Sequence, residues 1–526
     1  MYGWVSEPPQ EVSGAMTGEE CELKMRVQPE VLARVRRHPL IARYRTGRAV
    51  TRFQRSIYFD TPELALYRQG IVLRIRSVGR QRIQTVKGPG LRVAGLFQRR
   101  EWEARVHGDR PELAPLMESE FAAAFSVPGL AIALRPIFST EVKRTTIILA
   151  DEDWDVELAL DEGLIVPMKG DGPAAPIHEI ELELRRGTPA RLFALGRDFQ
   201  QGLPVRVQIA SKSDRGFEMA SGAGGKARKA TPIVLTPDLD AGGAFRLIAQ
   251  SCVEHFLANQ DALIDQRLPE SIHQLRVALR RFRSALILFR RFAQTPESAR
   301  IKHEIRWLLD GLGPARDVDV FLAEILDGAP KRLAAPGTTA LRAHFERDRT
   351  TSYDAALERF QDPRCGALFL AIGAWLEEGD WQSRNRAPSE IPVIDFAARE
   401  LERRYIRLRK DGKRLGKLPD EQRHLFRIEI KRMRYACEFF EALFDSRRTK
   451  KMIAQLAAIQ DALGGLNDIA VAREKLLNAV AAHDDPEIAW SAGLIAGFHL
   501  ARTKDLLADA TKAWRSFCAL DTFWET

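Results

Sequence analysis

Residues 20–24 read Glu20-Cys21-Glu22-Leu23-Lys24, and this stretch decides how the first half of the chain is interpreted. Side chains along a β-strand alternate between two faces, so a strand here would place Glu20, Glu22 and Lys24 together on one face. Taken alone, the stretch is most simply an edge strand with a charged face in water. Two carboxylates and an ammonium group in one row could instead bind a divalent metal and an anion together. The segments that follow favour this second interpretation.

The same one-sided charge recurs on later segments. Residues 71–77 place Arg74 and Arg76 on one face, and residues 177–185 do the same with Glu179, Glu181 and Glu183. Many short strands joined by turns are typical of an antiparallel barrel. In a closed barrel with a polar lumen, acidic groups for a metal and basic groups for phosphate oxygens would meet. A sandwich with its charged faces in water is the alternative for any single strand.

Other segments complete the expected barrel. We expect strands over residues 52–58, 82–87, 96–106 and 154–161, with Gly88-Pro89-Gly90 as the turn that ends the strand 82–87. Residues 135–149 are long enough for a strand pair or for one bent strand. Residues 29–44 and 111–125 are expected to be helical.

Length and composition limit the possibilities further. The chain has 526 residues, which exceeds what one core usually supports, so we expect two or three domains. A hydrophobic fraction of 45% and a charged fraction of 29% are typical of a soluble globular protein. The formal net charge of +9 indicates an acidic partner, such as a phosphate chain, nucleic acid or an anionic membrane surface.

The cysteines and the apolar segments indicate the compartment. No CxxC pair occurs, which argues against a zinc site or a disulfide framework and fits a reducing compartment. The opening residues lack the basic start and apolar run of a secretory signal, and no apolar stretch of about 20 residues occurs. We therefore expect a cytoplasmic protein without a membrane partner. The five cysteines lie far apart, at Cys21, Cys252, Cys365, Cys437 and Cys518.

The motifs of the first half resemble the CYTH, or triphosphate tunnel metalloenzyme, superfamily. Glu20-x-Glu22-x-Lys24 is similar to the ExExK signature of that superfamily. The order of the other pieces makes the resemblance specific over residues 18–218. The resemblance implies an eight-stranded antiparallel tunnel that hydrolyses triphosphate groups or, in one branch, cyclises ATP. The other pieces are Tyr58-Phe59-Asp60-Thr61, Leu73-Arg74-Ile75-Arg76, Lys87-Gly88, Arg99-x-Glu101-Trp102-Glu103, Glu179-Ile180-Glu181-Leu182-Glu183 and Ser211-Lys212-Ser213.

This resemblance also implies roles for individual residues. Glu20 and Glu22 would bind a divalent cation, while Glu179 and Glu181, together with Asp161, would hold a second metal or position the attacking water. Lys24, Glu179 and Glu181 are the expected catalytic residues. The expected ligands of phosphate oxygens are Lys24, Arg74, Arg76, Lys87, Arg99, Lys212 and Arg144, the last with an open strand register because Lys143 precedes it.

The chemistry of these side chains agrees with such roles. Hard carboxylate oxygens suit Mg²⁺ or Mn²⁺, and guanidinium groups bind phosphate through two parallel hydrogen bonds. Phosphoryl transfer needs mainly positioning and charge neutralisation, so a nucleophilic side chain is not required.

A linker and an internal repeat organise the second half. Residues 221–240 are rich in glycine, small residues and proline, and helical segments follow them. His273-x-x-Arg276-x-x-x-Arg280-Arg281-x-Arg283 recurs as His424-x-x-Arg427-x-x-x-Lys431-Arg432-x-Arg434, at an offset of 151 residues. The same offset relates Leu312-Gly313 to Leu463-Gly464 and Asp317 to Asp468, so two similar helical bundles are expected, joined near residues 383–392.

Each copy of the repeat predicts a basic stripe on one helix. Positions i, i+3, i+7 and i+10 share a narrow face, since each residue advances the helix by about 100°. Arg281 and Arg432 lie off this face. A single basic helix is usually just a solvated surface, but the duplicated spacing favours a pair of sites for a linear polyanion. The two stripes consist of His273, Arg276, Arg280 and Arg283, and of His424, Arg427, Lys431 and Arg434.

These repeated motifs resemble the CHAD domain, an all-helical domain named for its histidines and often found after a CYTH domain. The resemblance spans about residues 242–520 and includes Lys512-x-Trp514-Arg515. It implies binding of inorganic polyphosphate through the two stripes. The second copy departs in having Lys431 in place of an arginine and Asn467 where the first copy has Arg316, so the two halves could differ in affinity.

We therefore predict an α+β multidomain protein. A CYTH tunnel over residues 18–218 and a linker over 219–241 would precede an all-α CHAD domain over 242–520, made of two pseudo-symmetric bundles (about 242–383 and 393–520). The predicted function is metal-dependent hydrolysis of inorganic triphosphate, with Mg²⁺ or Mn²⁺, combined with polyphosphate binding in the cytoplasm or at polyphosphate granules.

Three alternatives remain open. The tunnel could hydrolyse thiamine or nucleoside triphosphates or cyclise ATP, since all these substrates present the same triphosphate. The protein could also be a non-catalytic polyphosphate-binding scaffold. Nucleic acid is permitted by the net charge but is not an expected partner, because no recognisable nucleic-acid motif or aromatic stacking platform occurs.

Overall fold

The computed structural model describes residues 10–12, 15–168, 172–222, 224–384 and 386–525. Most of the opening residues inspected for a secretory signal, and part of the predicted joint at 383–392, lie outside these ranges. Within them, the chain forms two compact units. Unit 1 comprises Met1–Ala227, Leu257–Gln266 and Phe360–Gly379, and unit 2 comprises Arg228–Phe256, Arg267–Arg359 and Asp380–Thr526.

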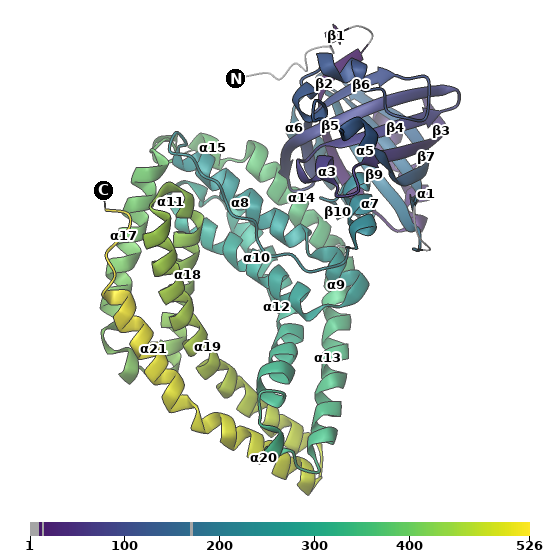
Figure 1. The fold of residues 1–526 in the computed structure, drawn as a ribbon. Coiled ribbons are helices and arrows are strands. Elements are labelled where there is room, and N and C mark those ends of the chain that lie inside the picture. The colour runs from purple at the N-terminus through teal and green to yellow at the C-terminus, as the bar shows by residue number, and fades with distance from the viewer. Residues whose placement is uncertain (1–9, 13–14, 169–171, 223, 385, 526) are drawn as a thin grey trace. The chain divides into compact units, whose positions relative to one another are not determined.

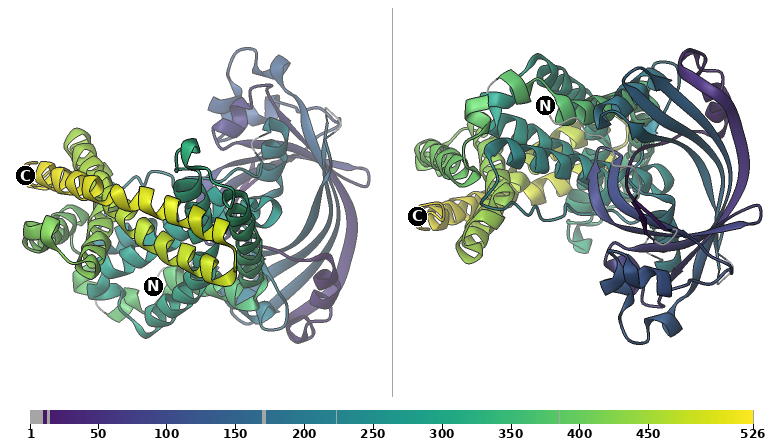
Figure 2. Two further views of the ribbon diagram at one scale, coloured as in Figure 1. Left: turned by 90° about the horizontal axis from the view of Figure 1, so that it is seen from below. Right: turned by 90° about the horizontal axis from the view of Figure 1, so that it is seen from above.

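Unit 1 is built around a closed antiparallel barrel, as predicted (Figure 1). The strand order is β2-β6-β5-β4-β3-β7-β8-β9, and pairing of β9 with β2 closes the ring of eight strands. The strands are long and curved, as Figure 2 shows. Two short strands, β1 (Gln10–Val12) and β10 (Arg206–Val207), pair with β2 outside this ring. The eight are β2 (Ala15–Arg26), β3 (Arg45–Asp60), β4 (Val72–Val78), β5 (Gln81–Val93), β6 (Leu96–Arg105), β7 (Arg135–Asp151), β8 (Trp154–Pro167) and β9 (Ala175–Arg186).

The register of the strands turns the charged faces inward. Across β2 and its neighbours, Glu20 lies opposite Arg99, Glu22 opposite Glu183, and Lys24 opposite Glu181. Because the side-chain period is two, every second residue of these strands then faces the lumen. The apolar residues between them face outward and are buried under helices and turns. One such outer cluster joins Leu73, Ile75, Val86 and Trp102 of the strands to Phe121 and Phe125.

Three helices from distant parts of the sequence complete unit 1. These are α6 (Pro189–Gln200), α9 (Gln260–Gln266) and α14 (Pro363–Glu378). A Cβ atom on Gly196 of α6 would lie 3.1 Å from both Leu23 of β2 and Leu370 of α14. A Cβ on Gly373 would lie 2.2 Å from the Phe193 ring. Thus α6 packs closely between the barrel wall and α14, and α14 is part of the barrel unit although it lies far beyond the linker.

Two local predictions in the first half are wrong, and a third is refined. Gly88-Pro89-Gly90 does not end a strand: β5 continues to Val93 through an irregular register between Lys87 and Gly90. A Cβ on Gly90 would lie 2.2 Å from the carbonyl oxygen of Gln98, so close approach of β6 explains that glycine. Residues 29–44 form two helices, α1 (Pro29–Val35) and α2 (Pro39–Tyr44). Residues 111–125 contain only a 3₁₀ turn, η1 (Ala114–Glu118), and α4 (Ala122–Phe125).

Unit 2 is helical, and its long helices reproduce the internal repeat. Helices α10 (Pro269–Leu288) and α18 (Asp420–Phe439) have the same length and begin 151 residues apart. Arg276 of α10 approaches Gly313 of α12 (Pro296–Val320), and Arg427 of α18 approaches Gly464 of α19 (Ser446–Ala482). The equivalent contacts confirm that the two copies fold alike.

Further helices surround these four. None of the helices among the described residues is long and apolar enough to cross a membrane. Helices α19 and α21 run side by side (Figure 1). The others include α8 (Ala241–Leu257), η2 (Phe321–Leu326), which is a π-helical extension of α12, α13 (Thr338–Gln361), α17 (Val393–Asp411), η4 (Gly412–Lys417), α20 (Pro486–Ala501) and α21 (Thr503–Cys518).

Candidate functional site

The lumen of the barrel contains a polar cavity of about 160 Å³. Every predicted phosphate ligand lines it, including Arg144, whose register the structure defines by pairing it with Asp161. Glu20, Glu22 and Glu181 also line it, whereas Asp161 and Glu179 lie behind the lining with no exposed surface. The charged lining consists of the seven cations Lys24, Arg74, Arg76, Lys87, Arg99, Arg144 and Lys212, and the six carboxylates Glu20, Glu22, Glu101, Glu103, Glu181 and Glu183.

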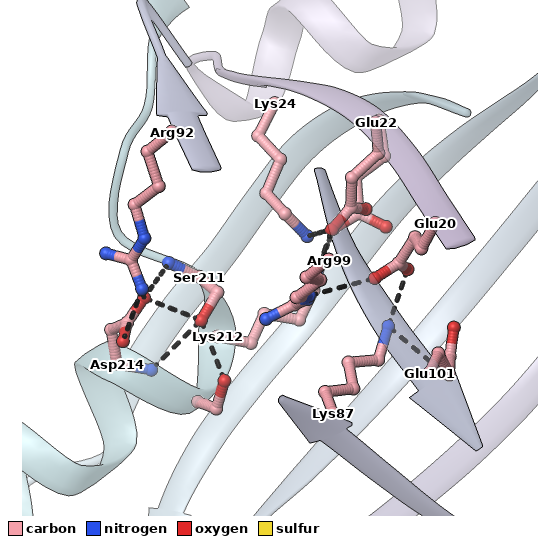
Figure 3. A network of polar contacts seen from close by, with 12 residues as sticks. Glu20, Glu22, Lys24, Lys87, Arg92, Arg99, Glu101, Ser211, Lys212 and Asp214 are labelled. Atoms are coloured by element: carbon pink, nitrogen blue, oxygen red, sulfur yellow. Dashed lines mark hydrogen bonds and ion pairs between the residues drawn. The ribbon is translucent and has the colours of Figure 1, made fainter. Parts of the chain in front are cut away.

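The motif on β2 contacts residues of β5, β6 and β9, and Figure 3 shows its contacts with Lys87 and Arg99. Lys24 Nζ lies 2.8 Å from Glu22 Oε1 and donates to Glu181 Oε1 at 2.7 Å. Arg99 donates from Nε to Glu20 Oε2 at 3.0 Å and from Nη2 to Glu22 Oε1 at 3.2 Å. Lys87 Nζ donates to Glu20 Oε1 at 2.5 Å. Burial alone would raise the pKa of Glu20, but the charges of Lys87 and Arg99 outweigh burial and hold that pKa well below its usual range.

A second cluster forms around Glu181, Asp161 and Glu179. Lys212 Nζ lies 2.7–2.8 Å from an oxygen of each of these three carboxylates. Arg144 binds Asp161 through two hydrogen bonds of 2.8 and 2.6 Å and also donates to Glu181. Burial would raise the pKa of Glu181, but Lys212, Lys24 and Arg144 together hold it well below its usual value. These carboxylates therefore hold the side chains of Lys212 and Arg144 in place at one side of the cavity.

Lys212 reaches the cavity because a helix begins there. Ser211 caps α7 (Lys212–Ser221): its hydroxyl accepts from the backbone N–H of Asp214 at 3.1 Å, and the Asp214 carboxylate accepts from the Ser211 N–H at 2.9 Å. Arg92 Nη2 lies 3.2 Å from Asp214 and holds the same turn from β5 (Figure 3). Sequence reasoning identified Ser211-Lys212-Ser213 as a motif, and the capping box shows what the first serine does.

Arg76 differs from the other cations of the cavity. Its side chain lines the lumen, and among the described residues it has no ion pair with a carboxylate. Its Nε is buried without a hydrogen-bond partner. Burial lowers the pKa of Arg76, and the neighbouring Arg74 and Arg144 lower it further. An unpartnered guanidinium beside two others is a ready ligand for an anion.

Glu183 is a lining residue whose importance the sequence did not reveal. Burial raises its pKa to about 8, and the charges of Glu20 and Glu22 contribute to the rise. Glu22 lies directly opposite it on β2. Alternation already placed Glu183 in line with Glu181, but only the closure of β9 onto β2 brings it to two further carboxylates. Glu101, Glu103 and Tyr58 are likewise lining residues that sequence reasoning left without a role.

The fit of a divalent metal depends on these carboxylates. Glu20, Glu22 and Glu183 supply the hard oxygen donors that Mg²⁺ and Mn²⁺ prefer, and their mutual repulsion is relieved by a cation. Within the described residues no three side chains are already arranged as a metal site. Glu20 and Glu22 contact Lys87, Arg99 and Lys24 instead. The oxygen donors of Glu20, Glu22 and Glu183 fit a divalent metal by their chemistry.

The two predicted stripes of unit 2 adjoin each other, since α10 packs against α18. Burial, together with the charges of Arg427 and Arg280, lowers the pKa of Lys431 to about 7. Burial also lowers the pKa of Arg276 to about 10, with Arg280 adding to the effect. Off the stripes, Arg281 covers the Phe439 ring at 5.4 Å and Arg432 pairs with Glu429, as expected for structural residues. The stripes thus concentrate positive charge that little within the described residues neutralises.

The histidines of the two stripes have different neighbours. His424 Nδ1 lies 3.2 Å from Asn467 Oδ1 on α19. His273 has Arg316 in the equivalent place, and burial together with the charge of Arg316 lowers its pKa. The substitution of Asn467 for Arg316 therefore changes the surroundings of one histidine.

Comparison with known protein families agrees with both halves of this architecture. Residues 18–217 match the family model of the CYTH domain, and residues 247–477 match that of the CHAD domain. The chain carries a CYTH domain followed by a CHAD domain. The CYTH match coincides with the barrel and ends in α7, and the CHAD match includes both basic stripes.

Individual relatives cover different parts of the chain. An inorganic triphosphatase of Haemophilus influenzae is 30% identical over 214 residues, which are 39% of this chain and 55% of that protein. The chain therefore matches about half the length of that relative. An uncharacterised protein of Mycobacterium tuberculosis is 26% identical over 84% of this chain and 85% of its own length. The crystal structure of the CHAD domain from Ricinus communis, 31% identical, covers 56% of this chain and 98% of its own, with a TM-score of 0.50.

Proposed function

We propose that the CYTH domain hydrolyses inorganic triphosphate with the help of a divalent metal. The observation that carries the proposal is the convergence of seven cations in one closed lumen, where Arg76 and Glu183 form no ion pair among the described residues and the pKa of Glu183 is raised. A chain of three phosphates presents closely spaced negative oxygens that match such a lining. The name of the Haemophilus influenzae relative supports the same substrate.

Glu20, Glu22 and Glu183 are the residues we assign to the metal. A bound Mg²⁺ or Mn²⁺ would polarise phosphate oxygens and neutralise the negative charge of the substrate. The lining needs such help, because its seven cations are nearly cancelled by its six carboxylates. Asp161 and Glu179 suit a different role, since they are fully buried and anchor Lys212 and Arg144.

The side chains of the chain itself would bind and orient the substrate. Arg74, Arg76 and Arg144 would hold phosphate oxygens from one side and Lys24, Lys87 and Lys212 from others, which aligns the phosphorus for attack by water. Glu181 is a weak proton acceptor because its three cationic partners hold its pKa so low. We therefore assign Glu181, like Lys24, to positioning the cations around the reacting phosphate.

A phosphate-release assay tests this proposal. Wild type and Glu22→Ala are compared on triphosphate with and without Mg²⁺ or Mn²⁺, and Glu162→Ala, whose side chain is exposed on β8, serves as control. We expect metal-dependent release by wild type and by the control, and a loss of about a hundredfold or more in Glu22→Ala. Equal release by Glu22→Ala and wild type would exclude the role given to Glu22.

The same assay separates the alternative functions. Thiamine and nucleoside triphosphates are included, and phosphate, pyrophosphate and cyclic nucleotide are scored. Faster turnover of an organic triphosphate would show that this compound, and not inorganic triphosphate, is the substrate. A cyclic product would show that the reaction is cyclisation and not hydrolysis. Absence of turnover with every substrate, at retained polyphosphate binding, would leave the scaffold function.

For the CHAD domain we propose binding of inorganic polyphosphate along the two stripes. Support comes from their adjoining placement and from the scarcity of ion pairs: among the described residues of the stripes, Arg434 with Glu438 is the recorded pair. Arg280→Gln with Arg427→Gln should weaken polyphosphate binding by about tenfold or more. We place both activities in the cytoplasm, where polyphosphate granules would be a second location. Easy displacement of polyphosphate by duplex DNA at physiological salt would contradict this ligand.

A further inference from the structure

A groove in unit 2 lies between η4 and α21, away from the stripes. We call it the η4 groove. It consists of two hollows of about 540 and 700 Å³ that share Gly416, Thr511 and Arg515. Lys413, Arg414 and Lys417 come to it from η4, and Lys504, Lys512 and Arg515 come from α21. All six cations are exposed, and no carboxylate belongs to the lining of either hollow.

The six cations stand out because none of them is paired with a carboxylate within the described residues. Two acidic residues that flank η4 are engaged elsewhere: Asp411 lies 3.6 Å from Arg407, and Asp420 pairs with Arg423. Six like charges around one depression repel each other, so an anion that enters it relieves the repulsion.

The groove is held in shape by close backbone packing. A Cβ on Gly412 would lie 2.3 Å from the ring of Trp514, so η4 starts directly on that ring. Trp514 is buried, stacked on Phe517 at 5.3 Å and edge-on to Phe426 at 5.2 Å. The backbone of η4 departs from helical geometry at Arg414. These contacts hold η4, with its three basic residues, against α21, so the groove is preformed.

No stripe residue belongs to the lining of either hollow, and the second stripe and α21 contact different faces of α19. Gly464 of α19 meets Arg427 of the second stripe, whereas the next residue, Gly465, meets Leu506 of α21 at 3.1 Å. Adjacent residues of a helix point about 100° apart. The groove is therefore a separate place on the surface of unit 2.

We propose that the η4 groove is a second binding site for an unbranched inorganic phosphate chain. Small residues (Gly416, Ala508 and Ser516) line it between the cations, which lets a thin chain approach them closely. No exposed aromatic side chain is available to stack on bases, which favours an inorganic chain over nucleic acid. The site does not depend on the stripes. When both are occupied, one chain held at two places binds more tightly than at either alone.

Lysine footprinting on the chain with both domains tests whether polyphosphate binds in the η4 groove. Acetylation rates of Lys413, Lys417, Lys504 and Lys512 are measured by mass spectrometry, with and without size-fractionated inorganic polyphosphate. We expect polyphosphate to slow acetylation of these four lysines severalfold and to leave the exposed Lys450 and Lys451 of α19 unchanged. The experiment is repeated in Arg280→Gln with Arg427→Gln, where protection of the groove should persist even if the stripes no longer bind. Equal protection of Lys450 and Lys451, or none in the groove, would overturn the proposal.

Affinity measurements with a matched control test how much the η4 groove contributes to polyphosphate binding. Lys512→Gln with Arg515→Gln removes two charges from the groove, and Arg447→Gln with Lys450→Gln removes the same two charge types from the exposed start of α19. We expect the groove variant to bind polyphosphate about tenfold more weakly and the control to bind as wild type does. An equal loss in both variants would show a general charge effect and overturn the site. A single-stranded oligonucleotide with the same number of phosphates should bind more weakly, and equal binding would overturn the choice of an inorganic chain.

Discussion

At the scale of single residues, the lumen distinguishes carboxylates that have cationic partners from those that do not. Glu20 and Glu181 each accept hydrogen bonds from two or more cations and hold low pKa values. Glu183 has a raised pKa in the same cavity because it is buried and because the charges of Glu20 and Glu22 add to the rise. Glu181 and Glu183, two residues apart on β9, are therefore suited to different tasks: Glu181 organises cations of the protein, and Glu183 can bind one that arrives from solution.

Glu183→Gln tests the metal assignment. The amide keeps the size of the side chain but is a poorer metal ligand, so the Mg²⁺ concentration for half-maximal activity should rise about tenfold or more. The rate at saturating Mg²⁺ should fall much less. Titrating Mg²⁺ in the phosphate-release assay measures both. Because Glu183 has no recorded ion pair within the described residues, the melting temperature should not fall. An unchanged Mg²⁺ requirement would remove Glu183 from the metal site.

Lys431 predicts a pH dependence of polyphosphate binding. Its pKa is lowered to about 7 by burial and by Arg427 and Arg280, so the free protein carries this charge below pH 7 and loses it above. A bound polyanion favours the charged form, so binding should take up protons and weaken between pH 6 and 8. Affinities measured across that range check the sign. Lys431→Arg, which stays charged throughout, should remove most of the slope, and an unchanged slope in this variant would contradict the assignment.

At the scale of elements, α7 connects helix capping to the chemistry of the lumen. Ser211 is the N-cap, so the capping box of Ser211 and Asp214 makes Lys212 the first residue of the helix. It thereby sets the point from which the Lys212 side chain enters the cavity. The same device occurs in unit 2, where Thr295 and Ser298 cap α12. The two caps therefore form a matched pair, only one of which is next to the site.

Ser211→Ala should affect both stability and substrate binding. Loss of the cap destabilises by about 1 kcal/mol, and the freed Lys212 should raise the KM for triphosphate. Thermal unfolding and steady-state kinetics measure the two effects. Thr295→Ala is the control, because it removes an equivalent cap and should leave KM unchanged. Equal KM values in both variants would show that α7 does not position Lys212.

Strand alternation accounts for how much of the site the sequence predicts. A period of two holds whatever surrounds the strand, so the inward direction of Glu20, Lys24 and Arg74 follows from local sequence alone. The special position of Glu183 does not, because it depends on β2, which is about 160 residues earlier and closes the barrel. The turn predicted at Gly88-Pro89-Gly90 failed for a related reason. The glycines there are required by the close approach of Gln98 and Phe121 and not by a turn.

Helical periodicity predicts which residues share each stripe, and the constant offset of 151 residues predicts the repeat. Neither identifies which helices pack together. The apolar face of α14 could pack on any apolar surface of sufficient length. Its small residues Gly366 and Gly373 reveal their partner only in three dimensions, where they meet Val205, Gln200 and Phe193 of unit 1. The predicted domain limits, drawn at the glycine-rich linker, remain a prediction. The compact units show in addition that two later segments join the barrel.

At the scale of the whole molecule, α14 connects the two family matches. Gly373 lies within the CHAD match yet packs on Phe193 of the barrel unit. Gly373→Ala should therefore destabilise unit 1 by about 1–3 kcal/mol through overpacking and should lower triphosphatase activity on heating. Gly493→Ala is the control, since Gly493 is also helical and has no atom within 4 Å of a Cβ placed there. Thermal inactivation of phosphate release compares the two, and identical curves would contradict the packing role of α14.

The membership of α14 in unit 1 also has a consequence for synthesis of the protein on the ribosome. The strands of the barrel are complete by Arg186, but unit 1 acquires its last helix only when residues up to Gly379 have emerged. Residues 228–256 and 267–359, which belong to unit 2, are made in between. At typical elongation rates this delay lasts roughly ten seconds or more. During it, the apolar surface of α6 around Phe193 lacks its cover, so we expect the nascent barrel to expose an apolar patch that chaperones can bind until the first helical repeat has been translated.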